Sequence, residues 1–174
     1  VWGLSKQELG YLAFKMGDLH TGKKFIGETT SFARDHGVLI GVAEGGVRLA
    51  EIALHEGQSG EAVRAATEAR DAAEKCGCTP FTLVHAKTEL AAIAVENAMR
   101  EAAQLPEAEK ALKAAEDDAQ KFRIKRFTAE TQLLRAKLVP AHEFEKRYNL
   151  TREAFETLST MESERRGDAE VAVG

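Results

Sequence analysis

The sequence predicts an all-α protein whose antiparallel helix pairs stack as a short right-handed α-solenoid, followed by a long C-terminal helix. Apolar residues recur at steps of three and four along nearly the whole chain, which is the period of one helix face. The 174 residues are rich in alanine and include only three prolines, and these residues have the highest and the lowest helix propensity. No stretch shows convincing strand alternation.

Glycines set the expected boundaries of the first four helices. The first helix is predicted over residues 5–20, with a break at Thr21-Gly22. The second helix ends at Gly37 and the fourth near Gly77, because glycine readily takes the left-handed conformation that ends a helix. Four helical elements are therefore expected before Pro80.

One segment, residues 37–46, is ambiguous. It could form a short buried strand or the start of a helix that contains glycines. We favour the helix because the span 38–56 is almost as long as the span 81–99, although each interior glycine costs a helix about 1 kcal/mol.

Prolines organise the second half of the chain. A helix is predicted over residues 81–100, the next one opens at Pro106, where proline suits the first turn, and Pro140 interrupts the helix that starts at residue 124. The last element is expected to be one long helix, because its apolar residues recur at alternating steps of four and three. These residues are Phe144, Tyr148, Thr151, Phe155, Leu158 and Met161.

The chain is long enough for one ordinary domain, which would bury roughly 70% of the surface of the unfolded chain. We predict a single helical-repeat domain over residues 1–166 and a disordered tail at 167–174. A repeat of about 37 to 45 residues is expected. The predicted units are 5–37, 38–77, 81–122 and 124–166.

The second unit pairs a large apolar residue with a small one and then places small residues where its helices cross. These residues are Leu49-Ala50, Ala53, Ala62, Ala66 and Ala69. In this pattern the chain resembles degenerate, slightly long tetratricopeptide-like repeats, which occur in many bacterial regulatory and scaffold proteins. The resemblance covers about residues 5–138 and lacks most aromatic and proline signature positions. A non-repeating helical bundle is the alternative.

The resemblance implies a concave surface formed by the first helix of each unit. The positions that it assigns to a partner are Gln7, Phe14, Glu44, Val47, Glu51, Leu54, His85 and Thr88. This lining is mixed, mildly acidic and partly apolar, and it lacks the basic and amide set with which related chaperone co-factors hold a C-terminal carboxylate. A peptide or helix docked through apolar anchors is expected, and plain packing is the alternative for each position.

Composition argues against several classes of protein. The net charge of −4 provides no basic stripe for nucleic acid, and the basic stretch 121–126 is expected to be a solvated turn. The longest apolar run, Val38–Ala43, is too short for a bilayer, so no membrane partner is expected. Cys76 and Cys78 are expected to be free thiols, one buried and one exposed, in a reducing cytoplasm.

No pattern predicts a catalytic residue, a metal ion or a cofactor. Residues 17–24 have the spacing of a phosphate-binding loop, but Lys24 stands where a magnesium-binding hydroxyl is needed. The histidines lie singly, whereas a zinc site needs four close ligands. We expect a non-catalytic protein-interaction or scaffold module. The alternatives are a sensory or regulatory segment of a larger bacterial signalling or transcription protein, and a cofactor-binding helical bundle or enzyme.

The C-terminal helix carries the most aromatic face of the chain. Its residues Phe144, Tyr148, Phe155, Leu158 and Met161 are expected either to cap the last repeat or to pair with a second copy of the chain, because apolar patches mark interfaces when they are exposed.

Overall fold

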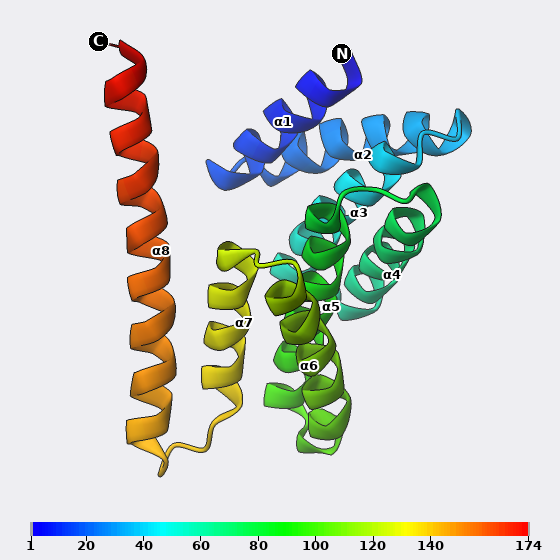
Figure 1. The fold of residues 1–174 in the computed structure, drawn as a ribbon. Coiled ribbons are helices and arrows are strands. Elements are labelled where there is room, and N and C mark those ends of the chain that lie inside the picture. The colour runs from blue at the N-terminus through cyan, green and yellow to red at the C-terminus, as the bar shows by residue number, and fades with distance from the viewer. Residues whose placement is uncertain (1, 174) are drawn as a thin grey trace. The chain divides into compact units, whose positions relative to one another are not determined.

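The computed structural model describes the backbone of residues 2–173 and the side chains of residues 6–162. Its regular secondary structure within this part is entirely helical (Figure 1), which confirms the all-α prediction. The helices are α1 (Trp2–Lys15), α2 (Leu19–Asp35), α3 (Leu39–His55), α4 (Ser59–Cys76), α5 (Pro80–Arg100), the short 3₁₀ helix η1 (Ala102–Gln104), α6 (Leu105–Lys121), α7 (Lys125–Leu138) and α8 (Phe144–Val173).

The chain divides into two compact units, and α5 passes from the first into the second. Unit 1 is Val1–Ile93 and unit 2 is Ala94–Gly174. The single repeat domain over residues 1–166 and the disordered tail at 167–174 stay predictions. Helix α8 is traced through Val173, but the side chains of the predicted tail lie outside the described residues.

The turns that end α1, α2, α3, α4 and α6 share one backbone geometry. Each contains a residue with positive φ, namely Gly17, Gly37, Gly57, Gly77 or Arg123. The N–H of that residue donates to the carbonyl three residues earlier, and the next N–H donates to the carbonyl five residues earlier. This pattern is a Schellman motif, which satisfies the last carbonyls of a helix. The four glycines are evenly spaced, and α2, α3 and α4 have similar lengths of 17, 17 and 18 residues.

The break predicted at Thr21-Gly22 is wrong, because the first turn lies at Gly17 and both residues belong to α2. The Asp18 side chain caps α2 by accepting a hydrogen bond from the Thr21 N–H at 3.0 Å. Gly22 is buried, and a Cβ there would lie 2.9 Å from the Cβ of Phe14. This glycine therefore allows α1 and α2 to approach closely and does not end a helix.

The helix predicted for the glycine-bearing segment after Gly37 is confirmed, since α3 begins at Leu39. Its glycines lie where neighbouring helices come closest. A Cβ on Gly46 would lie 3.0 Å from the Cβ of Ala69 in α4. The cost of interior glycine in a helix is here offset by close packing, which local sequence patterns do not reveal.

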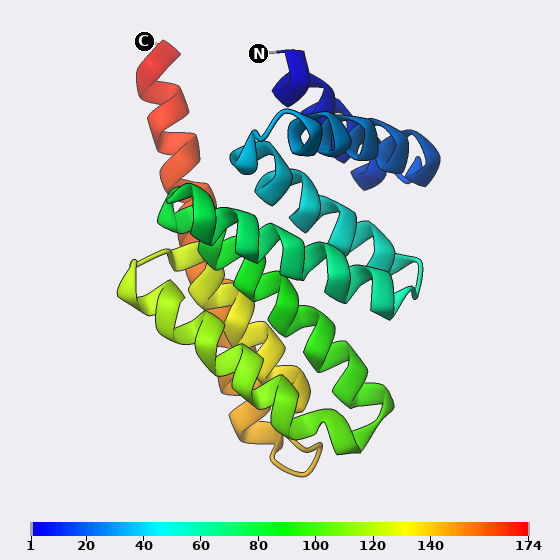
Figure 2. The same ribbon diagram turned by 90° about the vertical axis from the view of Figure 1, so that its right-hand side faces the viewer.

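In unit 1 the successive helices run antiparallel, and α3 lies beside α1 in the same direction. Figure 2 shows α3 and α4 side by side as such an antiparallel pair. The core between them is made of small residues together with one large side chain from α5. This cluster is Ala50, Ala53, Ala62, Ala66 and Ile93, all buried. Short side chains let the helices pack closely, which explains the alanine-rich composition.

In unit 2, α7 packs between α6 and α8. Phe127 of α7, Leu112 of α6 and Ala154 of α8 are fully buried. Arg135 of α7 donates two hydrogen bonds to the Glu116 carboxylate of α6, at 3.0 and 2.6 Å. Figure 1 shows α7 and α8 as neighbouring antiparallel helices. One side of α8 is thereby covered.

Candidate binding face

Unit 1 presents a polar surface along α1 and α3, which we call the α1–α3 face. The two helices run in the same direction, so successive turns of α1 lie beside successive turns of α3. The face consists of Glu8, Tyr11 and Lys15 of α1 and Glu44, Arg48 and Glu51 of α3.

Most charges on this face are paired across the two helices. Lys15 forms an ion pair with Glu51, and Arg48 forms one with Glu8. The ring of Tyr11 lies between the two cations, with Lys15 Nζ at 5.0 Å and Arg48 Cζ at 4.9 Å from its centroid. Such cation–π contacts and ion pairs align α1 with α3.

Glu44 is the exception on the α1–α3 face. It is half-buried, and it has no hydrogen-bond or ion-pair partner among residues 6–162. Burial raises the pKa of its carboxyl, and the charge of Glu8 adds to this, while the charge of Arg48 opposes it. A half-buried carboxylate without a partner is costly, so this position favours a cation or a hydrogen-bond donor from outside.

Two buried donors on α1 and α3 also lack an acceptor. Gln7 Nε2 and Arg48 Nη1 are buried and have no hydrogen-bond partner in the described part of the chain. Only 3% of Gln7 is exposed, and its amide lies against Gly45. Buried donors nearly always have a hydrogen-bond acceptor in native proteins. The region between α1 and α3 therefore contains two N–H groups that could still donate a hydrogen bond.

Four of the eight residues that the resemblance assigned to a partner are buried and line no surface. Phe14 packs with Ile26 and Ile52. Val47 packs with Ala69 and Ala86. Gln7 and Thr88 are also buried, and the Thr88 hydroxyl donates to the Val84 carbonyl at 2.9 Å. These side chains hold unit 1 together.

The other four are half-buried, and only two of them lie on the α1–α3 face. Glu44 and Glu51 occupy that face. Leu54 packs against the alanine-rich core, and the His85 ring lies edge-on to the Phe81 ring at 6.1 Å between centroids. The role of these four in binding stays a prediction.

Three residues of the α1–α3 face are not among the positions that the resemblance assigned to a partner. They are Tyr11, Lys15 and Arg48. A shift of one position turns a side chain by about 100° around a helix, so a small error in register selects the buried face. The available signal was local: Tyr11 and Lys15 are four residues apart, and Arg48 follows Glu44 by the same step, a spacing typical of interacting pairs.

The residues assigned to the C-terminal face separate into two groups. Phe144, Tyr148 and Phe155 are exposed. Leu158 and Met161 are half-buried. The exposed group is distinct from the α1–α3 face, since it belongs to unit 2.

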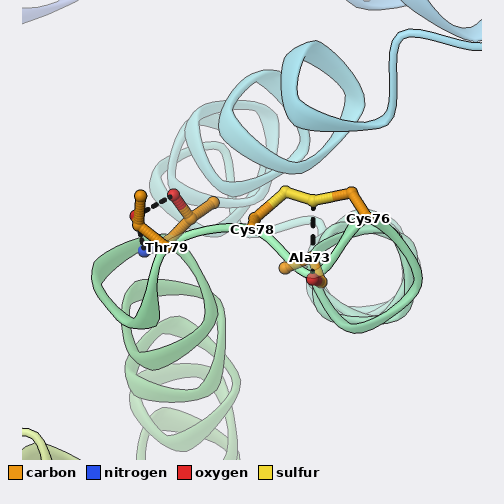
Figure 3. Close-up of a disulfide and its surroundings, with 5 residues drawn as sticks. Ala73, Cys76, Cys78 and Thr79 are labelled. Carbon is orange, nitrogen blue, oxygen red and sulfur yellow. Dashed lines mark hydrogen bonds between the residues drawn. A yellow bond between two sulfur atoms is a disulfide. The ribbon is translucent and has the colours of Figure 1, made fainter.

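The two cysteines form a disulfide at the end of α4, so the prediction of one buried and one exposed thiol is wrong. Both residues are half-buried, and their Cα atoms are 5.1 Å apart. Figure 3 shows the two side chains meeting close to Ala73. The left-handed conformation of Gly77 brings them together. The cysteines therefore give no support to a reducing compartment, and the cytoplasmic location stays a prediction.

No three or more histidine, cysteine or acidic side chains gather in the described residues where they could hold a metal ion. In the same part of the chain, no helix combines the length and the apolar character that crossing a membrane requires.

No protein-family model, curated protein or solved structure matches the chain. The chain is therefore defined by its structure, as an all-α protein of two compact units. The first unit carries an ion-paired polar face, and the second carries exposed aromatic side chains.

Proposed function

We propose that the chain is a non-catalytic protein-interaction module of the tetratricopeptide-like kind, and that the α1–α3 face receives a short basic segment of a partner protein. The observation that carries this proposal is the unpaired, half-buried carboxylate of Glu44 on a face whose other charges are paired. A lysine or arginine side chain placed there would give this carboxylate a charge-assisted hydrogen bond and offset the cost of its burial.

The arrangement of unit 1 supports the repeat part of the proposal. The turns that end α1 to α4 are evenly spaced, and α3 lies beside α1 in the same direction. Stacked hairpins of this kind place the first helix of each pair on one common surface. The proposed solenoid is right-handed, as in the repeats that the sequence resembles.

The nature of the face argues for a short peptide. Tyr11 and the stems of Lys15 and Arg48 provide apolar contact, and Glu44 provides one charge to read. Peptide grooves often work in this way, with contact area for affinity and a few polar groups for specificity. The charges of Glu8 and Glu51 are already compensated by their ion pairs. Glu44 is therefore the residue that would distinguish basic peptides from other peptides.

The test is a selection of random peptides on the full chain, followed by affinity measurement with fluorescent versions of the enriched peptides. We expect enrichment of peptides that contain lysine or arginine. Glu44→Gln should weaken their binding by at least about tenfold, as loss of one charge-assisted contact would.

The matched control is Glu74→Gln, which removes an exposed carboxylate of α4 in the same unit. It should leave the affinity unchanged. Absence of enriched peptides, enrichment without a basic residue, or equal binding by Glu44→Gln would each overturn the proposal.

A further inference from the structure

The first turns of α8 expose three aromatic side chains in a line, which we call the aromatic stripe. Phe144 is 72%, Tyr148 54% and Phe155 69% exposed. Spacings of four and seven residues place them on one side of a helix. The Phe144 and Tyr148 rings stack at 6.3 Å between centroids. Ala154 of α8 is fully buried and lies on a different side of the helix from the stripe. The stripe therefore lies outside the contact between α8 and α7.

We propose that the aromatic stripe binds the same stripe of a second copy of the chain, with the two α8 helices antiparallel around a two-fold axis between Asn149 and Leu150. In this arrangement Phe144 lies opposite Phe155 of the second copy, and each Tyr148 lies close to the axis, opposite Thr151 of the second copy. A two-fold interface must be self-complementary, and the reciprocal pairing of Phe144 with Phe155 satisfies that condition.

The flanking charges point to the same arrangement. Glu145 and Arg152 are seven residues apart and therefore lie on the same flank of the stripe. Their midpoint falls within one residue of the midpoint of Phe144 and Phe155. The antiparallel register that pairs the aromatic rings thus also sets Glu145 opposite Arg152 of the second copy, twice.

In a parallel pair, the flank that carries Glu145 and Arg152 would face the opposite flank of the second copy, so neither residue would meet the other. Among residues 6–162, Arg152 forms a long ion pair with Glu156, with N and O atoms 3.6 Å apart on two exposed side chains, which a closer partner can replace. Charge complementarity therefore selects a second copy in the antiparallel orientation.

The interface is small, which sets the expected affinity. Each aromatic side chain can bury about 150–250 Å², and stable interfaces bury about 800 Å² per partner. The three rings and their flanks reach the lower part of that range. We therefore expect a weak dimer that forms at concentrations of tens to hundreds of micromolar, about the strength of small transient interfaces.

Sedimentation equilibrium of the full chain over this concentration range tests the proposal. The wild type should approach the mass of a dimer, and Phe155→Asp should remain a monomer with an unchanged circular dichroism spectrum, because that side chain is exposed. Thr160→Asp is the control: it adds the same charge to α8 away from the stripe and should dimerise like the wild type.

Charge exchange tests the register independently. Glu145→Arg and Arg152→Glu, each alone, place like charges opposite one another twice and should weaken the dimer at least about tenfold. The double variant Glu145→Arg with Arg152→Glu restores opposite charges and should dimerise like the wild type.

A wild type that stays monomeric, a Phe155→Asp variant that still dimerises, or a double variant as weak as the single ones would overturn the proposal. Because the stripe belongs to unit 2, none of these results depends on the α1–α3 face.

Discussion

Gly45 lies where α1, α2 and α3 meet, and it shows how a single hydrogen atom in place of a side chain sets the packing of unit 1. A Cβ at this position would lie 2.0 Å from Thr30 Oγ1 and 2.6 Å from Gln7 Nε2. Thr30 is held by a 2.7 Å hydrogen bond to the Ile26 carbonyl and is 1% exposed. Gln7 is also buried, with 3% of its surface exposed.

We therefore expect Gly45→Ala to lower the free energy of unfolding by about 1–3 kcal/mol, the usual cost of overpacking. Urea denaturation measures this change. Gly27→Ala is the matched control, because a Cβ there meets nothing within 4 Å and helical alanine is favoured over glycine by about 0.5–1 kcal/mol. Equal effects of the two variants would contradict the packing account.

The environment of Glu44 leads to a prediction about how stability depends on pH. Burial raises its pKa above the ordinary 4.5, so between that value and the raised one the folded state binds more protons than the unfolded chain. Stability of the wild type must then fall as pH rises through this window. Glu44→Gln has no such carboxyl and avoids the loss.

The expected outcome is that Glu44→Gln gains stability relative to the wild type between about pH 4 and about pH 7. Urea unfolding at the two pH values gives the difference. The Glu74→Gln variant should show no comparable change. A relative stability of Glu44→Gln that is independent of pH would mean that the carboxyl is not destabilised by burial.

At the scale of elements, the five matching turns differ at one position. Four have glycine in the left-handed conformation, and the turn after α6 has Arg123 with φ of 54°. This conformation costs a residue with a Cβ about 1–2 kcal/mol, so the α6–α7 turn is strained where the others are relaxed.

Arg123→Gly should therefore raise the free energy of unfolding by about 1 kcal/mol, the strain relieved less the entropy that glycine adds to the unfolded chain. Gly57→Ala makes the opposite change in an equivalent turn and should lower it by about 1 kcal/mol. Thermal unfolding of both variants checks this. Destabilisation by Arg123→Gly would show that the guanidinium contributes more than the strain costs.

At the scale of the whole molecule, the disulfide constrains very little of the chain. Cys76 and Cys78 are separated by two positions, and the stabilisation expected from a cross-link grows with the loop that it closes. In the chain-entropy model, a cross-link that closes a 15-residue loop stabilises the folded state by about 3 kcal/mol, and one that closes a three-residue loop stabilises it by about 1.5 kcal/mol. The folded state therefore depends on its helical packing.

We expect the double variant Cys76→Ser, Cys78→Ser to lose at most about 1.5 kcal/mol of unfolding free energy. Urea denaturation gives the value, and mass spectrometry after alkylation without reductant should show no modified cysteine in the wild type. A larger loss would mean that the disulfide holds the α4–α5 turn in a conformation that the chain does not otherwise take.

The sequence by itself determined the helices, because helices depend on neighbours along the chain. Apolar periodicity, the glycine stops at Gly37 and Gly77, and Pro106 in a first turn were enough to place most of them. The exception was Gly22, which has the same local signal as a turn but is buried against Phe14. Only contact between helices distinguishes these two uses of glycine.

The tertiary structure alone decided which sides of these helices are surfaces. The α1–α3 face joins Glu8 to Arg48 and Lys15 to Glu51, partners that lie far apart in sequence, and no local pattern selects them over Phe14 or Val47, which pack inside. The same holds for α8, where Phe155 is exposed and Ala154 is buried. Local interactions set the elements, whereas exposure is set by contacts that exist only after the helices have packed.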